Sequence, residues 1–157
     1  MKISALDQSP IRKGGTAADA VRETIELAKV CERLGYSRYW LAEHHNTTSF
    51  AGSTPEVLIA RVAAETSRIR VGSGGIMLPH YSPLKVAENF RMLETMYPGR
   101  VDLAIGRAPG SDGRTAVALQ AGPQAWDVGV FPQQAELLRH YLEESAGIAA
   151  WPDNHPY

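Results

Sequence analysis

The sequence predicts an α/β fold made of repeated parallel βα units. Four apolar stretches begin near residues 3, 38, 69 and 101, so their starts lie about 31 to 35 residues apart, the size of one βα unit with its loops. A segment with helical periodicity follows each stretch. Four units fit either an open doubly wound sheet or half of a TIM (βα)8 barrel. The first stretch is not followed by a Gly-x-Gly turn and no P-loop occurs, which weakens the open nucleotide-binding sheet.

The first unit combines a short strand with a well-marked helix. We expect the strand over residues 3–8. Thr16 suits the N-cap of the helix, and Asp19, three residues later, suits a capping box. Gly35 then ends the helix in a left-handed conformation. The buried stripe of this helix is predicted to be Val21, Ile25, Ala28, Cys31 and Leu34.

The second and third units follow the same plan. We expect a strand over residues 38–43, a polar loop over 46–53 and a helix over 54–67, where proline fits the first helical position. The third strand covers residues 69–77 and is rich in glycine. A helix over residues 82–97 follows and stops at a Tyr-Pro-Gly sequence. Its inward positions are predicted to be Leu84, Ala87, Phe90 (or Arg91 beside it) and Leu93.

The fourth unit has a long connection between its strand and its helix. We expect a strand over residues 101–105, a loop over 106–129 and a helix over 132–144. The tail over residues 151–157 is predicted to be turn-like. The inward positions of the last helix are predicted to be Leu137, Leu138, Tyr141 and Leu142.

Length and composition describe one globular domain over residues 1–157 that is able to bury a core. Of its 157 residues, 44% are hydrophobic and 21% are charged. The formal charge is -1 without a basic block, so neither nucleic acid nor an anionic membrane surface is indicated, and a small-molecule substrate is expected. The single cysteine, Cys31, is expected to be buried and inert. Since no signal peptide and no run of roughly 20 apolar residues occurs, we expect a cytoplasmic protein.

Chemically distinctive residues stand where each predicted strand ends. The first strand ends in Asp7-Gln8, the second in Glu43-His44-His45, the third contains Gly74-Gly75, and the fourth ends in Gly106-Arg107. The carboxyl ends of parallel barrel strands lie on one face, so these residues are expected to line a single mouth. This convergence predicts a site that binds a ligand there.

Each of these residues also has a purely structural alternative. Glu43 could cap a loop or pair with an arginine, and only one of His44 and His45 needs to face the mouth, because neighbouring strand residues point to opposite sides. Tandem glycines mark a bulge or permit close approach of a flat ring. Arg107 suits a phosphate or carboxylate but also an ordinary ion pair. A zinc site is not expected, because the Glu-His-His run lacks the i, i+4 spacing of helical zinc motifs, and His80, His140 and His155 are expected at the surface or in loops.

Four ordered motifs resemble the luciferase-like flavin monooxygenases. They are Trp40-Leu41-Ala42-Glu43-His44-His45, the run Val71-Gly72-Ser73-Gly74-Gly75-Ile76-Met77-Leu78-Pro79, the pairs Ser82-Pro83 and Ala87-Glu88, and Gly99-Arg100-Val101-Asp102-Leu103-Ala104-Ile105-Gly106-Arg107. The resemblance covers about residues 1 to 145. It implies a (βα)8 barrel, reduced FMN supplied by a separate flavin reductase, and insertion of one oxygen atom of O2 into a small organic substrate.

The resemblance also implies roles for individual residues. It assigns His44 to acid–base catalysis, Glu43 to the surroundings of the flavin, and Arg107 to the phosphate side of the cofactor. The strand around Ser73, Gly74 and Gly75 corresponds to a bulge that often holds a non-proline cis peptide behind the flavin ring. Luciferase alpha subunits have a cysteine directly before the arginine, whereas this chain has Gly106, which speaks against light emission and a long-chain aldehyde substrate.

Family members run to roughly twice this length, so the sequence corresponds to the N-terminal half of a barrel. An open half-barrel exposes a strand edge and an apolar sheet face, which indicates a homo-oligomer or association with the missing C-terminal half. The isolated chain is expected to have little monooxygenase activity. Two alternatives stay open: a deazaflavin-dependent oxidoreductase, and a catalytically inactive half-barrel that binds flavin or serves dimerisation.

Overall fold

The computed structural model describes residues 1–119 and 128–143 of the chain. Its centre is a four-stranded sheet in the order β1 (Ser4–Asp7), β2 (Arg38–Leu41), β3 (Arg70–Met77), β4 (Val101–Gly106). All three pairs of neighbouring strands are parallel. Parallel strands that neighbour one another in chain order are the arrangement of a barrel wall, whereas a doubly wound sheet reverses its order at a switch point. The predicted α/β class with four parallel units is confirmed.

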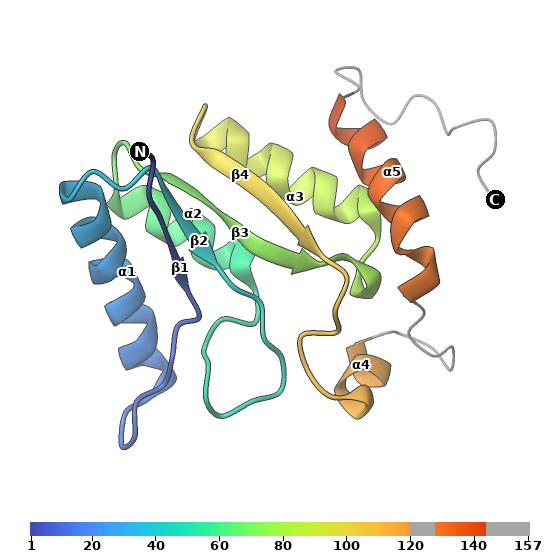
Figure 1. Ribbon diagram of the computed structural model, residues 1–157, viewed down its shortest axis with the longest axis horizontal. Coiled ribbons are helices and arrows are strands. Elements are labelled where there is room, and N and C mark those ends of the chain that lie inside the picture. The colour runs from blue at the N-terminus through green and yellow to red at the C-terminus, as the bar shows by residue number, and fades with distance from the viewer. Residues whose placement is uncertain (120–127, 144–157) are drawn as a thin grey trace.

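The helices lie against one face of this sheet. Figure 1 shows α1, α2 and α3 on the same side, with α5 beside α3, and the loops that follow β1, β2 and β4 leave at a common edge. No helix in the described ranges is both long and apolar enough to span a bilayer. The described helices are α1 (Ala17–Arg33), α2 (Pro55–Glu65), α3 (Pro83–Met96), α4 (Gly113–Leu119), α5 (Phe131–Glu143) and the 3₁₀ turns η1 (Leu78–His80) and η2 (Val128–Val130).

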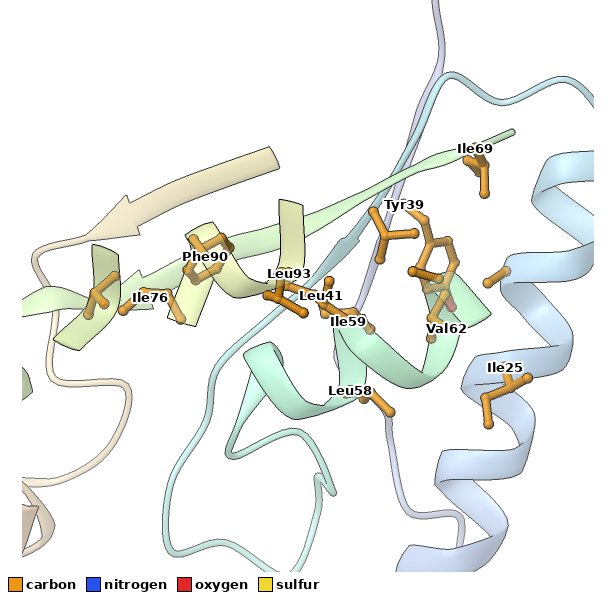
Figure 2. Packing of buried hydrophobic residues seen from close by; sticks show 14 of the residues in the cluster. Ile25, Tyr39, Leu41, Leu58, Ile59, Val62, Ile69, Ile76, Phe90 and Leu93 are labelled. Carbon is orange, nitrogen blue, oxygen red and sulfur yellow. The ribbon is translucent and has the colours of Figure 1, made fainter. Parts of the chain in front are cut away.

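Apolar side chains fill the space between the sheet and its helices. Tyr39 and Leu41 of β2 face this side, where they meet Ile59 and Val62 of α2, and all four are fully buried. Figure 2 shows these side chains together with those of α3. Burial of each such side chain stabilises the fold by about 1.5–3 kcal/mol. Because strand residues alternate, Trp40 between them projects from the other face.

Helix α1 begins and ends as its sequence predicts, with one exception. Thr16 Oγ1 accepts a hydrogen bond from the amide of Asp19, whose carboxylate accepts one from the amide of Thr16 at 2.8 Å, so the capping box is confirmed. Gly35 has φ +77° and ends the helix. Leu34 is 70% exposed, against prediction, because it is the C-cap and lies beyond the last helical turn. The buried residues are Ala20, Thr24, Ile25, Ala28 and Cys31.

Two charged side chains close the amino-terminal edge of the sheet. The Oε1 atom of Glu32 accepts hydrogen bonds from three consecutive amides that precede β3, those of residues 67–69. Arg100, just before β4, donates to the carbonyls of Ala63 and Thr66 at the end of α2 and to that of Ile69. These contacts satisfy backbone groups that a helix end and a strand start would otherwise leave unpaired. The charges at this edge therefore serve the fold.

The fourth unit differs most from its prediction. The expected loop over residues 106–129 contains helix α4, which Asp112 caps by accepting a hydrogen bond from the amide of Thr115 at 2.8 Å. Helix α5 begins at Phe131, and its Leu138 is buried as expected. Leu142, predicted to face inward, is 39% exposed. The predicted turn-like tail over residues 151–157 lies outside the described residues.

The opposite face of the sheet has no described helix over it (Figure 1). Leu6 of β1 is 60% exposed there. Trp40 lies beside Gly72, where a Cβ atom would come within 2.8 Å of the Trp40 ring. Asp102 of β4 accepts hydrogen bonds from Arg38 at 3.0 Å and from Arg70 at 2.8 Å on this face, which joins three strands. In a closed barrel this face lines the interior.

Candidate active site at the carboxyl ends of the strands

Glu43 lies two residues beyond β2 and is completely buried. Its Oε1 atom is 2.6 Å from Nε2 of His45 and accepts a hydrogen bond from the hydroxyl of Tyr81 at 2.7 Å, while Oε2 accepts one from the amide of Met77 at 2.9 Å. Three donors thus surround one buried carboxylate, as a buried charge requires. Through these hydrogen bonds Glu43 connects the segment after β2 to the end of β3 and to the segment before α3. Because it is fully buried, it does not line the open rim at the strand ends.

The two adjacent histidines have different surroundings. His45 is buried and its Nε2 is committed to Glu43, so this nitrogen carries the proton and donates it to the carboxylate. The ring of His44 packs on Phe50 with a centroid separation of 4.8 Å. Nδ1 of His44 is buried and has no hydrogen-bond partner in the described part of the chain. A buried nitrogen of this kind is costly unless a ligand or water bonds to it, so His44 is a candidate for contact with a ligand.

The loop that follows β4 folds back onto these residues. The amide of His45 donates to the carbonyl of Gly110 at 3.2 Å, and Nε2 of His80 donates to the carbonyl of Pro109 at 2.8 Å. His80 lies half-buried in the short turn η1, outside the strands and the α-helices, and its hydrogen bond holds the loop after β4 against this turn. Arg107 begins this loop, is exposed, and bonds to none of the described residues. Its guanidinium is thus available to an anion at the strand ends.

The glycine-rich part of β3 forms the expected bulge. Pairing with β4 shifts register between Gly74 and Ile76, and the Gly74–Gly75 peptide bond is cis. The hydroxyl of Ser73 donates to the carbonyl of Ala104 at 2.8 Å, so it repairs the ladder beside the bulge. A Cβ at Gly74 would lie 2.8 Å from the side chain of Leu6, and one at Gly75 would lie 2.7 Å from the Ala104 carbonyl oxygen. The packing of the chain itself therefore requires glycine at position 75, where the neighbour is backbone, whereas at position 74 the exposed Leu6 side chain could move aside.

The end of β1 has a structural role. Asp7 is buried and accepts hydrogen bonds from the amide of Ser9 at 2.8 Å, from the hydroxyl of Thr24 at 2.6 Å and from that of Tyr39 at 2.7 Å. Burial and the neighbouring Asp7 carboxylate raise the pKa of Tyr39 above its ordinary range. Asp7 thus points away from the mouth, while Gln8 beside it is exposed.

A second acid stands close to Glu43 and was not singled out in the sequence. Glu56, in the first turn of α2, has a raised pKa because burial disfavours its charge and Glu43 lies nearby. Burial and the hydrogen bond to Glu43 likewise raise the pKa of Tyr81. Glu56 and Tyr81 line a cavity of about 230 Å³ between the starts of α2 and α3. Glu56 and Glu43 are 13 positions apart in the sequence, and only the folded structure shows that the two acids lie near each other.

The arrangement offers a proton-transfer group and an anion-binding group on one rim. Nδ1 of His44 has no hydrogen-bond partner among the described residues, and an imidazole nitrogen can either donate or accept a proton. Arg107 stands at the end of the strand two positions along the sheet from β2. Among the described residues no group of three or more His, Cys, Asp or Glu side chains is arranged to hold a metal ion.

Comparison with known proteins agrees with this geometry. A family model described as luciferase-like monooxygenase matches residues 1–144. N-acetyl-S-alkylcysteine monooxygenase of Bacillus subtilis is 46% identical over 157 residues, which is 100% of this chain and 45% of that protein. The crystal structure of apo-MsnO8 superposes with a TM-score of 0.89 at 45% identity and covers 98% of this chain and 46% of that one. This chain therefore spans slightly less than half the length of the relatives it matches.

More distant structures share the fold alone. One is the oxygenating constituent of 3,6-diketocamphane monooxygenase from Pseudomonas putida in complex with FMN, with a TM-score of 0.69 at 22% identity, covering 90% of this chain and 37% of that one. Another is an F420-dependent secondary alcohol dehydrogenase, with a TM-score of 0.70 at 17% identity, covering 97% of this chain and 45% of that one. The fold thus occurs in proteins with flavin and with deazaflavin cofactors.

Proposed function

Because the chain belongs to the luciferase-like monooxygenase family, we propose that it forms the N-terminal half of an oxidoreductase that uses reduced FMN and O2 to oxidise a small organic substrate. A separate flavin reductase supplies the reduced cofactor. The whole reaction needs the remaining strands of the barrel, because residues 1–119 and 128–143 supply four of its eight strands. A cytoplasmic location fits a cofactor that is reduced by another soluble enzyme.

One observation carries the proposal: a buried imidazole nitrogen and a guanidinium, neither with a hydrogen-bond partner among residues 1–119 and 128–143, occur together on the carboxyl rim of a parallel sheet. His44 supplies the nitrogen and Arg107 the guanidinium. In barrel enzymes this rim is where ligands bind. The carboxylates of Asp7 and Glu32, by contrast, are engaged by donors of the protein itself.

The residues on this rim fit a flavin in three ways. Arg107 would bind the phosphate bidentately, as a planar guanidinium suits. The bulge at Gly74 and Gly75 would present backbone to the ring, although Gly75 already has a packing reason. Glu43 and Ser73, whose polar atoms are engaged by the protein, would support the site by fixing the ends of β2 and β3. Reduced flavin, when bound, supplies the electrons that activate O2.

His44 would hold or move the proton that the reaction requires. Its backbone amide donates to the carbonyl of Gly52 at 2.9 Å, and Phe50 packs against its ring, so both backbone and ring are oriented. Orientation of this kind is what general acid–base catalysis needs, and it is typically worth 10²–10⁴-fold in rate, as an order-of-magnitude estimate. We assign His44 as the catalytic residue on this basis.

FMN titration of the purified chain, followed by absorbance together with native mass, tests the proposal. We expect FMN to bind, and Arg107→Gln to weaken binding by about tenfold through loss of a charge-assisted contact. Arg68→Gln is the matched control, since Arg68 is an exposed arginine at the opposite edge of the sheet. Equal FMN affinity in both variants would refute the assignment of Arg107.

A deazaflavin-dependent oxidoreductase is the second candidate, since an F420-dependent dehydrogenase has the same fold. The same titration with a deazaflavin cofactor separates the two. Tighter binding of deazaflavin than of FMN, without oxygen consumption, would support this candidate. If neither cofactor binds and the chain dimerises strongly, a catalytically inactive half-barrel that serves assembly is the better description.

A further inference from the structure

A second hollow on the carboxyl rim lies between the tip of β2 and helix α4. It has a volume of about 370 Å³ and is lined by His45, Asn46, Arg114, Thr115, Ala118 and Leu119. The hydrogen bond from the side-chain amide of Asn46 to the hydroxyl of Thr115, at 3.0 Å, fixes α4 against the β2 tip. The sequence predicted a loop where α4 lies, so it contained no sign of the side of this cavity that α4 forms.

One residue that lines this cavity, His45, is buried, and a hydrogen bond orients its imidazole. His45 is 8% exposed, and Glu43 holds its Nε2 at 2.6 Å from behind. The second nitrogen, Nδ1, is then an acceptor, so it suits a donor group of a ligand rather than a carboxylate oxygen. Tyr81 and the amide of Met77 also donate hydrogen bonds to Glu43. These bonds compensate part of its negative charge and so reduce its repulsion of an anion in the cavity.

The remaining walls combine one cation with apolar surface. Arg114 is exposed, and its guanidinium bonds to no residue within the described ranges. Asp112, the nearest acid in sequence, is engaged by the amide of Thr115. Ala118 and Leu119 supply the apolar part. A single guanidinium beside apolar side chains suits a monoanion with a short hydrocarbon portion better than the dianionic phosphate of a cofactor, which usually receives several donors.

We propose that this cavity anchors the substrate by a carboxylate, with Arg114 as its charge partner, so that the substrates of the enzyme are small organic acids. The proposal rests on the monooxygenase function proposed above and names its substrate class. The side-chain amide of Asn46 is the polar donor beside Arg114 in this cavity, and the apolar part of the substrate lies along Ala118 and Leu119.

Carboxylate binding to the full chain without any flavin tests this separately from the monooxygenase function. The probes are pentanoate and its neutral isostere pentanamide, followed by NMR shifts of the His45 ring and of the Asn46 and Thr115 amides. We expect pentanoate to bind at least about tenfold more tightly than pentanamide. Arg114→Gln should remove this preference, while Arg114→Lys should retain part of it.

Two controls keep the result interpretable. Arg68→Gln, on the opposite edge, should leave pentanoate affinity unchanged, and thermal unfolding should show that the exposed Arg114 can be replaced without loss of the fold. Equal affinity for acid and amide, or pentanoate binding that survives Arg114→Gln, would overturn the proposal. A loss of FMN affinity in Arg114→Gln comparable with that in Arg107→Gln would also overturn it, because the cavity would then hold the cofactor phosphate.

Discussion

At the scale of single residues, Glu43 shows how one buried carboxylate organises the rim. It is fully buried, yet each of its oxygens accepts at least one hydrogen bond. The donors come from the loop after β2, from the end of β3 and from the segment before α3. Removing one donor therefore affects both stability and the placement of His45, because the buried charge must be compensated by the donors that remain.

Tyr81→Phe isolates the contribution of one donor. The substitution keeps the ring and removes the hydroxyl that bonds Oε1 of Glu43 at 2.7 Å. We expect the free energy of unfolding to fall by about 1–2 kcal/mol, measured by urea denaturation. Tyr36→Phe is the matched control, since the Tyr36 hydroxyl makes no hydrogen bond with any described residue. An equal loss in both variants would contradict this role.

The sequence predicted the positions of the polar groups of the site but not their hydrogen-bond partners. Glu43, His44 and His45 follow an apolar strand, so their position at a strand tip could be deduced. The hydroxyl of Tyr81, 38 positions away, bonds Glu43 only because β2 and β3 are adjacent. The same limit applies to His80, whose bond to Pro109 depends on how the loop after β4 returns.

At the scale of elements, local signals succeeded where they were strong. The capping box at Thr16, Gly35 beyond α1 and proline at the start of α2 fixed helix ends through their own chemistry. Helix α4 has only seven residues and begins with glycine, so propensity gave no warning of it. Its position depends on tertiary contacts such as that between Asn46 and Thr115.

The ion cluster of Arg38, Arg70 and Asp102 joins three strands and should make stability depend on pH. Burial acts to raise the pKa of Asp102, but hydrogen bonds and charge from Arg70 and Arg38 outweigh it and hold the pKa below 3.8. A carboxyl with a depressed pKa stabilises the fold above its unfolded pKa, and this contribution is lost as pH falls through the folded value.

Asp102→Asn should therefore destabilise the chain at neutral pH by about 1–2 kcal/mol, a figure reduced for the partial exposure of both arginines. In acid below the folded pKa of Asp102 the difference from the unmodified chain should vanish. Urea unfolding at a series of pH values measures both effects. Glu26→Gln is the control, because Glu26 is an exposed acid on α1. A pH-independent difference would exclude the electrostatic explanation.

At the scale of the whole molecule, the chain has a helix-covered face and an open face. The helix-covered face contains the apolar core, whereas the open face carries Leu6, Trp40 and the ion cluster around Asp102. The carboxyl ends of the strands on the sheet carry His44 and Arg107 beside this open face. Since the relatives are about twice as long, the interior of a complete barrel needs further strands against the same face.

We expect the isolated chain to associate through this open face, either with a second copy or with a polypeptide that supplies the missing half. Association through this face is favoured because it carries an exposed apolar side chain and no described helix covers it. Leu6→Asp should shift the native mass toward the monomer, because a carboxylate would have to be buried in the interface. Leu34→Asp is the matched control, since Leu34 is 70% exposed but lies at the end of α1, away from that face.

Native mass and analytical ultracentrifugation over a range of concentrations measure the outcome. Association of the unmodified chain and of Leu34→Asp, together with a monomeric and folded Leu6→Asp, is the expected result. Because Leu6 is 60% exposed, its replacement should leave the thermal unfolding of the monomer nearly unchanged. If Leu6→Asp associates as strongly as Leu34→Asp does, the contact uses another surface, and the open face then has no part in the assembly of the isolated chain.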